Sequence, residues 1–281
     1  MEILQLKYFC DSAESENFSK TAYKYNVPPS NISQAVHRLE TEIGVNFFDR
    51  TSNKVILNEY GRRFYNNVKI ALQKLDDACK EVRDDDINNH SEIKLKVCTN
   101  RRIVFKAIEN FKKLYPNVNF MLSHYYNDKG EFDLIISDIT DGEGVMNKEL
   151  LVREKIYVAS KKDNPVINDN VTLCSLKNER FISMPEKSSI YNLTERICST
   201  AGFEPNIAIK CDDPYYLRRY VELGLGIAFV PSFSWQGQFS DDVVYMDVCD
   251  FYRNTYIIYD SKRYMTKAVK QFKNMLFELC K

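Results

Sequence analysis

The chain has 281 residues, of which 44% are apolar and 28% are charged, and its formal net charge is zero. This length predicts about two globular domains, and this composition argues against intrinsic disorder. No apolar run approaches the roughly 18 residues that a membrane span needs, and the first sixteen residues, MEILQLKYFCDSAESE, lack the regions of a secretory signal. We therefore expect a soluble, cytoplasmic protein without a membrane partner.

The cysteines and histidines do not form the patterns of a disulfide framework or a zinc site. The eight cysteines include no C-x-x-C pair, and the three histidines lie far apart in the sequence. Gly224-x-Gly226 matches part of a dinucleotide fingerprint, but Phe229 stands at the third glycine position and a strand follows instead of a helix. No Ser/His/Asp set or phosphate loop is evident. We therefore expect buried free thiols, no metal, no cofactor and no enzymatic activity.

Three helices are expected in the first 44 residues. Apolar residues recur at helical spacing over Ile3–Ala13, and a second short helix extends over Asn17–Tyr25. After a break at two prolines, a third helix begins at Pro29 and ends at Gly44. This spacing is typical of a helix-turn-helix, in which the second helix of the pair enters the DNA major groove. The third helix is expected to face inward with Ile32, Val36, Leu39 and Ile43.

The outward face of the third helix is rich in hydrogen-bond donors and poor in acids. Glutamine suits adenine, arginine suits guanine, and serine suits either a base or a phosphate. Between Phe18 and Arg63, seven basic side chains stand against four acidic ones. A merely solvated polar face is the alternative interpretation. The candidate DNA-binding residues on this helix are Ser30, Asn31, Ser33, Gln34, His37 and Arg38.

A β-hairpin is expected between Phe47 and Leu57, where two apolar clusters flank a polar and basic turn around Ser52 and Asn53. Such a hairpin is the wing of a winged helix-turn-helix. Its polar side chains would lie near the phosphate backbone, where contacts position a protein without specifying sequence. The candidate wing residues are Arg50, Thr51 and Lys54.

These segments resemble the DNA-binding domain of LysR-type transcriptional regulators, over about sixty positions without a gap. The resemblance implies a winged helix-turn-helix over residues 1–58 and a dimerisation helix over 59–86. It also implies a homodimer or homotetramer, with double-stranded promoter DNA and RNA polymerase as partners. The matching motifs are Leu6-x-x-Phe9, Phe18-Ser-Lys-Thr-Ala22, Val27-Pro-Pro-Ser-Asn-Ile-Ser-Gln34, Leu39-Glu-x-x-Ile43-Gly44, Phe47-Phe-x-Arg50 and Leu57-x-x-x-Gly61.

Three residues depart from the pattern of the resembled family. Pro28 stands where serine or threonine usually caps the recognition helix and reaches a phosphate, and it can do neither. Thr21 replaces a small alanine. Asn58 replaces a threonine that often starts the next helix, a substitution that a capping asparagine tolerates.

A heptad pattern follows Gly61. Its apolar residues predict a seam that pairs two copies of the chain, and packing against the chain's own domain is the alternative. Asp84-Asp-Asp86 and the polar residues up to Glu92 are then expected to form a hinge. The residues of the seam are Phe64, Val68, Ala71, Leu75, Ala78 and Val82.

From residue 93 onward, strands and helices alternate, which predicts an α/β fold with mixed sheets. Helices are expected over 102–115 and near 189–201, 213–224 and 263–280. The expected strands are Ile93–Cys98, Phe120–Ser123, Phe132–Ser137, Lys155–Ala159, Arg180–Met184, Ile207–Cys211, Ile227–Pro231, Val243–Met246 and Thr255–Tyr259.

Residues 87–281 resemble the LysR effector domain, which is built like a periplasmic binding protein. The resemblance rests on Phe132-Asp-Leu-Ile-Ile136, Ala201-Gly-Phe-x-Pro205 and Gly224-Leu-Gly-Ile-Ala-Phe-Val-Pro231. It implies one lobe of residues 92–160 and 261–281, a second lobe of 161–260, and a small-molecule effector in the cleft between them.

Effector contacts are expected from loops at strand ends, and helix N-termini beside these loops favour an anionic effector. A polar loop that faces only solvent is the alternative for each residue. The candidates are Thr99, Asn100, Arg101, Ser137, Ser183 and Ser189.

Two further features bear on the effector domain. Relatives fit a second lobe-one helix between Pro116 and Phe132, where this chain has room only for a turn around Asn127-Asp-Lys-Gly130. A more open or ligand-free cleft is therefore expected. Peroxide-sensing relatives carry a cysteine pair, of which Cys198 matches one partner while Ser189 stands at the other, and this argues against a thiol switch. A solute-binding receptor with the same lobes and an enzyme are the competing interpretations.

Overall fold

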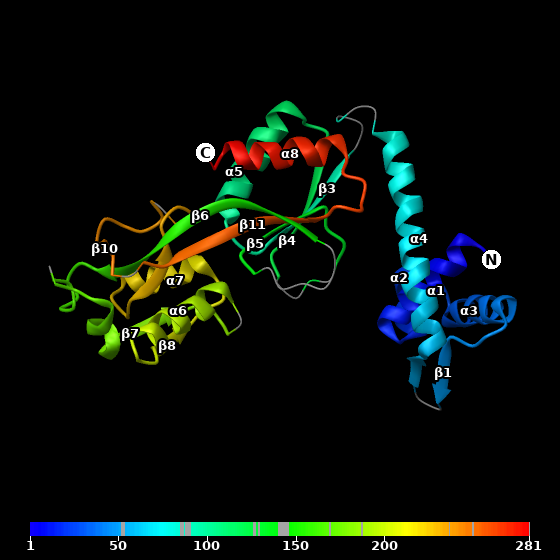
Figure 1. Cartoon of the computed structure of the whole chain (residues 1–281), viewed down its shortest axis with the longest axis horizontal. Helices are drawn as coiled ribbons and strands as arrows, with labels where there is room; N and C mark the ends of the chain where they lie inside the picture. Colours follow the sequence, from blue (N-terminus) through cyan, green and yellow to red (C-terminus); the bar gives the residue numbers. More distant parts are fainter. Residues whose placement is uncertain are drawn as a thin grey trace. The chain divides into compact units, whose positions relative to one another are not determined.

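The computed structural model describes residues 1–51, 54–84, 87, 91–125, 128, 130–139, 146–168, 170–186, 188–235, 237–248 and 250–280. Ser52 and Asn53 of the expected wing, Asp85 and Asp86 of the expected hinge, and Asn127 of the expected turn lie outside these residues. The chain forms two compact units (Figure 1). Within the described residues, no helix is long and apolar enough to cross a membrane. The units are Met1–Asp85 with Lys262–Thr266, and Asp86–Ser261 with Lys267–Lys281.

The first unit contains the expected helices and wing. Its core is aromatic: the ring of Phe47 stacks on that of Phe64 with centroids 4.6 Å apart, and Phe9 contacts both rings. The elements are α1 (Ile3–Ser15), α2 (Phe18–Tyr25), α3 (Pro29–Ile43), the antiparallel hairpin of β1 (Phe48–Thr51) and β2 (Lys54–Leu57), and the long helix α4 (Glu59–Arg83).

Local chemistry explains where these helices begin. The side chain of Asn17 accepts a hydrogen bond from the Lys20 amide at the start of α2, and Asn58 accepts one from the Gly61 amide at the start of α4. Pro28 precedes α3 without a side-chain cap. Gly61 has no room for a side chain, because a Cβ atom there would lie 2.3 Å from the carbonyl oxygen of Phe47.

The inner face of α3 agrees with the sequence at three of the four expected positions. Ile32, Val36 and Leu39 are fully buried. The expectation for Ile43 is wrong, since 42% of its surface is exposed. Ile43 occupies the last turn of α3, beyond Leu39, the last α3 residue in the hydrophobic core.

The first lobe of the second unit is a sheet covered by two helices. Helices α5 and α8 lie together on one side of the sheet (Figure 1), and the rings of Phe111, Phe120 and Phe272 pack between them at centroid distances of 5.1–5.8 Å. The elements of this lobe are β3 (Glu92–Val97), α5 (Arg101–Leu114), β4 (Asn119–Ser123), β5 (Leu134–Ser137), β11 (Tyr252–Asp260) and α8 (Lys267–Glu278).

The second lobe has its own core, in which Phe181 stacks on Phe229 at 5.7 Å. Strands β7 and β8 are parallel, and β9 and β10 pair with β6. The elements are the 3-10 helix η1 (Leu173–Asn178), β7 (Arg180–Ser183), α6 (Ser189–Thr200), β8 (Asn206–Lys210), α7 (Pro214–Glu222), β9 (Ala228–Pro231) and β10 (Val243–Met246).

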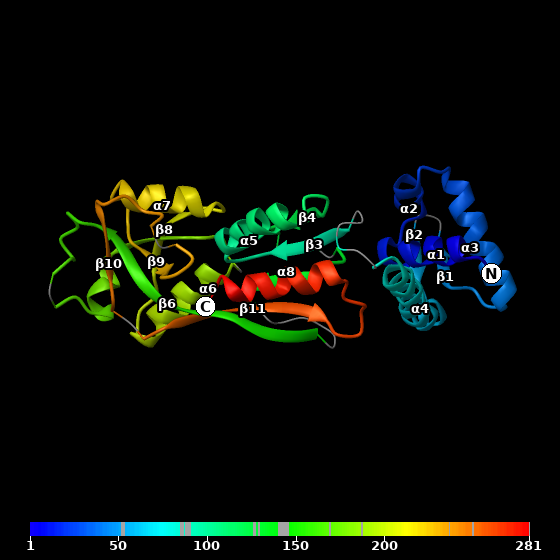
Figure 2. The ribbon, with the colours of Figure 1, turned by 90° about the horizontal axis from the view of Figure 1, so that it is seen from above.

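Strand β6 (Met146–Lys161) joins the two lobes and is much longer than the expected strand Lys155–Ala159. Its first half pairs with β11, and its second half pairs with β9 and β10. Strands β6 and β11 run side by side along the second unit (Figure 2). The sequence missed the first half because its apolar residues Leu150-Leu-Val152 are consecutive and do not alternate with the charged residues beside them.

None of the described residues between β4 and β5 is helical, in keeping with the short connection expected there. Strand β4 is the last strand of its sheet, whose order is β10-β6-β11-β5-β3-β4. Met121 and Leu122 of β4 are 55% and 42% exposed.

Candidate functional site

The outer face of α3 presents the residues expected to bind DNA. Ser30, Asn31, Gln34, His37 and Arg38 are exposed, and Ser33 is half-buried. In the wing, Arg50 and Thr51 belong to β1 and Lys54 belongs to β2, where Thr51 and Lys54 face each other in the register. The six α3 residues therefore share one helix, and the three wing residues share one hairpin.

A buried carboxylate connects α3 to the wing. Glu40 is only 3% exposed, and its Oε1 accepts hydrogen bonds from the amides of Phe47 at 2.8 Å and Phe48 at 3.4 Å. These bonds hold the start of β1 against the end of α3. The recognition helix and the wing are thereby fixed relative to each other.

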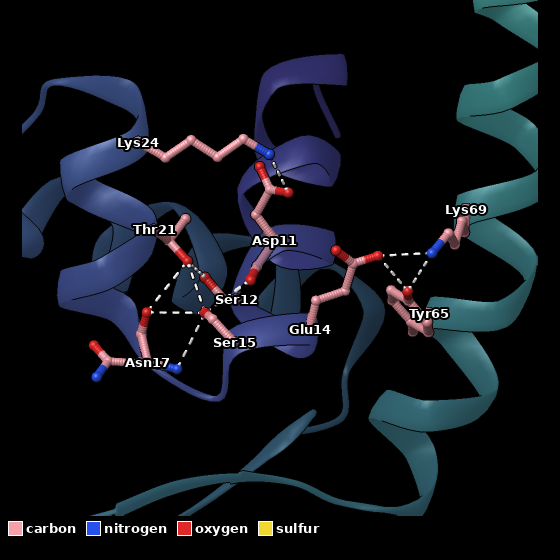
Figure 3. A network of polar contacts seen from close by, with 9 residues as sticks. All are labelled: Asp11, Ser12, Glu14, Ser15, Asn17, Thr21, Lys24, Tyr65 and Lys69. Atoms are coloured by element: carbon pink, nitrogen blue, oxygen red, sulfur yellow. Dashed lines mark hydrogen bonds and ion pairs between the residues drawn. The ribbon is translucent and has the colours of Figure 1, made fainter. Parts of the chain in front are cut away.

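Buried hydroxyl groups connect α2 to α1 (Figure 3). The Thr21 hydroxyl lies 3.3 Å from the hydroxyls of both Ser12 and Ser15 and donates to the carbonyl oxygen of Asn17. Thr21, which replaces a small residue in the family pattern, therefore has polar partners on the neighbouring helix.

A second polar group connects α1 to α4 (Figure 3). Lys69 Nζ and Tyr65 Oη both donate to Oε1 of Glu14, at 2.7 and 2.5 Å. Burial acts to raise the pKa of Glu14, but the hydrogen bonds from Lys69 and Tyr65 outweigh it, and the pKa lies below its ordinary value. The long helix is thus attached to the helix-turn-helix by a charged contact.

The apolar seam of α4 divides into two parts. Phe64 and Val68 pack into the core of their own unit, as the alternative interpretation proposed. Leu75 and Val82 are instead 50% and 79% exposed. Only the second part of the seam is available to another chain.

The second unit contains a cavity of about 250 Å³ where the first turns of α5, α6 and α7 meet. Both lobes contribute to its wall. It is lined by Cys98, Thr99, Asn100, Arg101, Arg102, Met184, Ser188, Ser189, Ile190, Asp213, Pro214, Tyr215, Arg218, Ser234, Trp235, Gln238 and Arg253.

Asn100 presents an oxygen atom at the start of α5. It has a left-handed backbone (φ 53°), and its Nδ2 donates to Thr255 Oγ1 at 2.7 Å and to Glu154 Oε1 at 3.3 Å. The Glu154 carboxylate can only accept, so it fixes the orientation of the amide. Within the part of the chain that the structure describes, Asn100 Oδ1 and the neighbouring Thr99 Oγ1 have no hydrogen-bond partner, although both residues are more than nine-tenths buried.

The other two helix starts are already capped. Ser188 accepts a hydrogen bond from the Tyr191 amide at the start of α6, and Asp213 accepts one from the Tyr215 amide at the start of α7. The hydroxyl of Ser189 donates to the carboxylate of Asp138. This last bond joins the second lobe to the first.

Two arginines at the cavity differ in whether they form an ion pair. Arg253 is buried and paired with Glu154, its Nη2 lying 2.7 Å from Oε1. Arg218 is half-buried, with its guanidinium 5.4 Å from the ring centre of Trp235, and it has no ion pair within the described ranges. Burial lowers the pKa of Arg218, although the charges of Asp213 and Glu222 act in the opposite direction.

Four of the six expected effector contacts line the cavity: Thr99, Asn100, Arg101 and Ser189. Ser137 and Ser183 do not. The Ser137 hydroxyl accepts from the amide of Ile139, and Ser183 is fully buried.

Sequence reasoning missed the contribution of α7 and of the segment after β9. Arg218 and Trp235 belong to these parts. Asp213-Pro214 is a typical helix start, so the beginning of α7 could have been marked as a cavity candidate like those of α5 and α6.

Within the described ranges, no group of histidine, cysteine or acidic residues could hold a metal ion. Cys198 is fully buried.

Both units match models of known protein families. Residues 3–62 match the family model "Bacterial regulatory helix-turn-helix protein, lysR family", and residues 92–281 match "LysR substrate binding domain". The transcriptional dual regulator GltC of Bacillus subtilis is 27% identical over 248 residues, which cover 82% of this chain and 81% of GltC.

Solved structures support the same fold. A full-length OxyR variant from Pseudomonas aeruginosa has a TM-score of 0.69 at 19% identity, covering 100% of this chain and 94% of that one. Full-length CbnR, solved with its target DNA, has a TM-score of 0.55 at 18% identity, with 100% of both chains covered.

Proposed function

The chain belongs to the LysR family of bacterial transcription regulators, and we propose that it reads promoter DNA with the outer face of α3. The observation that carries this proposal is that face itself: six polar or basic side chains without an acid among them, on the helix after the turn. Gln34 and Arg38 suit adenine and guanine edges in the major groove. Arg50, Thr51 and Lys54 of the wing contact phosphates and position the helix.

We further propose that the protein acts in the cytoplasm as a homodimer or homotetramer, and that it is not an enzyme. The exposed part of the α4 seam supports pairing of two chains, which would present two recognition helices to a two-fold related operator. The cavity of the second unit receives a small-molecule effector, through Thr99, Asn100, Arg101 and Ser189. Ligand binding there changes how the dimers sit on the promoter.

The base-reading role is tested by gel-shift titration of the full chain on operator and random DNA at several salt concentrations. Gln34→Ala or Arg38→Ala should reduce the discrimination between the two DNAs by about 1–3 kcal/mol. Lys54→Ala serves as the control for a phosphate contact and should weaken both complexes alike while lowering the salt dependence. An equal loss on both DNAs for Gln34→Ala would exclude base reading by this residue.

A further inference from the structure

The two lobes offer different chemistry to a ligand in the cavity. The first lobe contributes Asn100 Oδ1, a buried acceptor without a partner within the described ranges. Its orientation is set by Glu154, because a carboxylate can only accept and so requires the amide nitrogen on its side. An unsatisfied buried acceptor favours a ligand that supplies a hydrogen-bond donor at this point. A carboxylate oxygen there would face another acceptor.

The second lobe contributes a positive charge through Arg218. This guanidinium is half-buried against Trp235 and has no ion pair within the described ranges. The charges of Asp213 and Glu222 act on this guanidinium without forming an ion pair with it. A partly desolvated guanidinium without such a pair suits an anionic ligand group, a carboxylate in particular. Arg253 is less suited to this role, because its charge is already paired with the Glu154 carboxylate, which accepts from its Nε and Nη2.

The size and the remaining wall of the cavity restrict the ligand further. A volume of about 250 Å³ lies near the lower end of the roughly 300–1,000 Å³ that is typical of small-molecule sites. Met184, Ile190 and Trp235 supply apolar surface. The occupant is therefore a small molecule with a short carbon skeleton.

We propose that the effector is a small carboxylate that also carries a hydroxyl or ammonium group. Its carboxylate pairs with Arg218 of the second lobe, and its hydroxyl or ammonium group donates to Asn100 Oδ1 of the first. This inference rests on the proposed function of the cavity as the effector site. Because the two contacts come from different lobes, the ligand holds the lobes together. Arg218 determines the preference for an anionic ligand. Asn100 determines the preference for a ligand that carries a hydrogen-bond donor.

The test is a titration of the full chain with carboxylates in matched sets, followed by calorimetry. Each set shares one carbon skeleton: lactate, alanine and propionate; malate, aspartate and succinate; 2-hydroxyglutarate, glutamate and glutarate. In at least one set, the hydroxy or amino acid should bind roughly tenfold or more tightly than the plain acid, because the plain acid leaves the Asn100 acceptor unpaired. Equal affinities within every set, or no binding by any probe, would overturn the inference.

Two variants assign the contacts. Arg218→Met keeps an apolar stem against Trp235 and should abolish binding of the preferred acid, whereas Arg219→Met is the matched control on the same helix, since Arg219 is exposed and pairs with Glu222. Asn100→Gly tolerates the left-handed backbone and should remove the preference for the donor. Retained preference in Asn100→Gly or retained binding in Arg218→Met would also overturn the inference.

These outcomes are distinct from failure of the proposed function. Equal binding of plain acids that Arg218→Met abolishes would leave the cavity as the effector site and exclude only the donor requirement. Binding that neither variant changes would mean that ligands bind elsewhere, so that the effector site itself is wrong. Gel shifts on operator DNA report the DNA-binding role separately.

Discussion

Thr21 shows how a single residue that departs from its family pattern is accommodated. It is 2% exposed, and its hydroxyl meets those of Ser12 and Ser15 on α1. These hydrogen bonds form because α1 and α2 each place hydroxyl groups in the cluster. The hydroxyl of Thr21 therefore has polar partners on the neighbouring helix.

Replacing one member of this cluster should cost more than replacing two. Thr21→Val keeps the shape but leaves the fully buried Ser12 without its partner, and we expect a loss of about 1–3 kcal/mol in the free energy of unfolding. The double variant Ser12→Ala/Thr21→Val should lose less than Thr21→Val alone. Calorimetric unfolding of the full chain measures both, and a double variant less stable than the single one would contradict the role of the hydroxyl pair.

At the scale of single residues, the sequence predicted those features that depend on residues nearby along the chain. Asn58 as a cap and Pro28 as an uncapped helix start follow from residue type and local spacing. The Ser12–Thr21 contact and the pairing of Glu154 with Arg253, 99 residues apart, depend on which helices and strands become neighbours. No local pattern contains that information.

At the scale of elements, α4 serves two purposes along its length. Its first part is held to α1 by Phe64, Val68 and the Glu14 contact. Its second part exposes Leu75 and Val82. The heptad pattern predicted one continuous seam because apolar spacing is the same in both parts, and only tertiary packing separates them.

The Glu14 contact should depend on pH. A carboxyl group whose pKa is lowered in the folded state stabilises the fold above its unfolded pKa of about 4.3, and this contribution is lost as the pH falls through the lower folded value. Glu14→Gln should therefore speed hydrogen exchange in α1 and α4 at pH 7, and its difference from the parent protein in acid unfolding should shrink as the pH falls below about 4.3. Glu109→Gln, an exposed pair with Lys113 in the second unit, is the control. A difference that persists unchanged at about pH 3 would show that the loss is not electrostatic.

The exposed part of α4 should carry the contact between chains. Leu75→Asp places a charge in the seam and should weaken the dimer roughly tenfold or more, because that charge must be desolvated on pairing. Sedimentation velocity measures the change. Asn66→Asp, on an exposed position of the first part of α4, should leave the dimer intact; a Leu75→Asp protein as dimeric as this control would exclude the seam as the main contact.

At the scale of the whole molecule, the chain is divided between a DNA-binding unit and a ligand-binding unit. In the second unit, β6 runs through both lobes and pairs with β11 of the first, and the buried pair of Glu154 and Arg253 joins these two strands directly. Glu154 also receives bonds from Asn100 in the first lobe and from the Ser234 amide in the second. One carboxylate thus connects the two halves of the cavity wall.

Breaking this pair should be costly for the second unit. Arg253→Met leaves the Glu154 carboxylate buried without its counter-charge, and we expect a loss of about 3–5 kcal/mol in the free energy of unfolding. Glu154→Gln/Arg253→Met should recover much of it. Urea unfolding followed by fluorescence of Trp235, the only tryptophan, reports this unit specifically. A single variant as stable as the double would mean that the pair does not hold the strands.

The two-lobed fold was predictable for two reasons. The strands, helices and turns have local sequence patterns, and the family resemblance implied how these elements divide into two lobes. The cavity was predictable only in part. Thr99 and Asn100 directly follow a strand, which marks them as candidates. Arg218 lies in the second turn of α7 and Trp235 in an irregular segment, so their approach to the same space required the fold itself.

The position of β4 at the edge of its sheet has a consequence for how the protein behaves in concentrated solution. β4 pairs with β3 on one side, and as the last strand of the sheet it carries the exposed side chains of Met121 and Leu122. Such an edge can accept a strand from any other molecule, which is how native sheets begin to aggregate. We therefore expect this edge to promote association in concentrated solutions, and a charge such as Leu122→Lys should extend the time that the protein stays in solution.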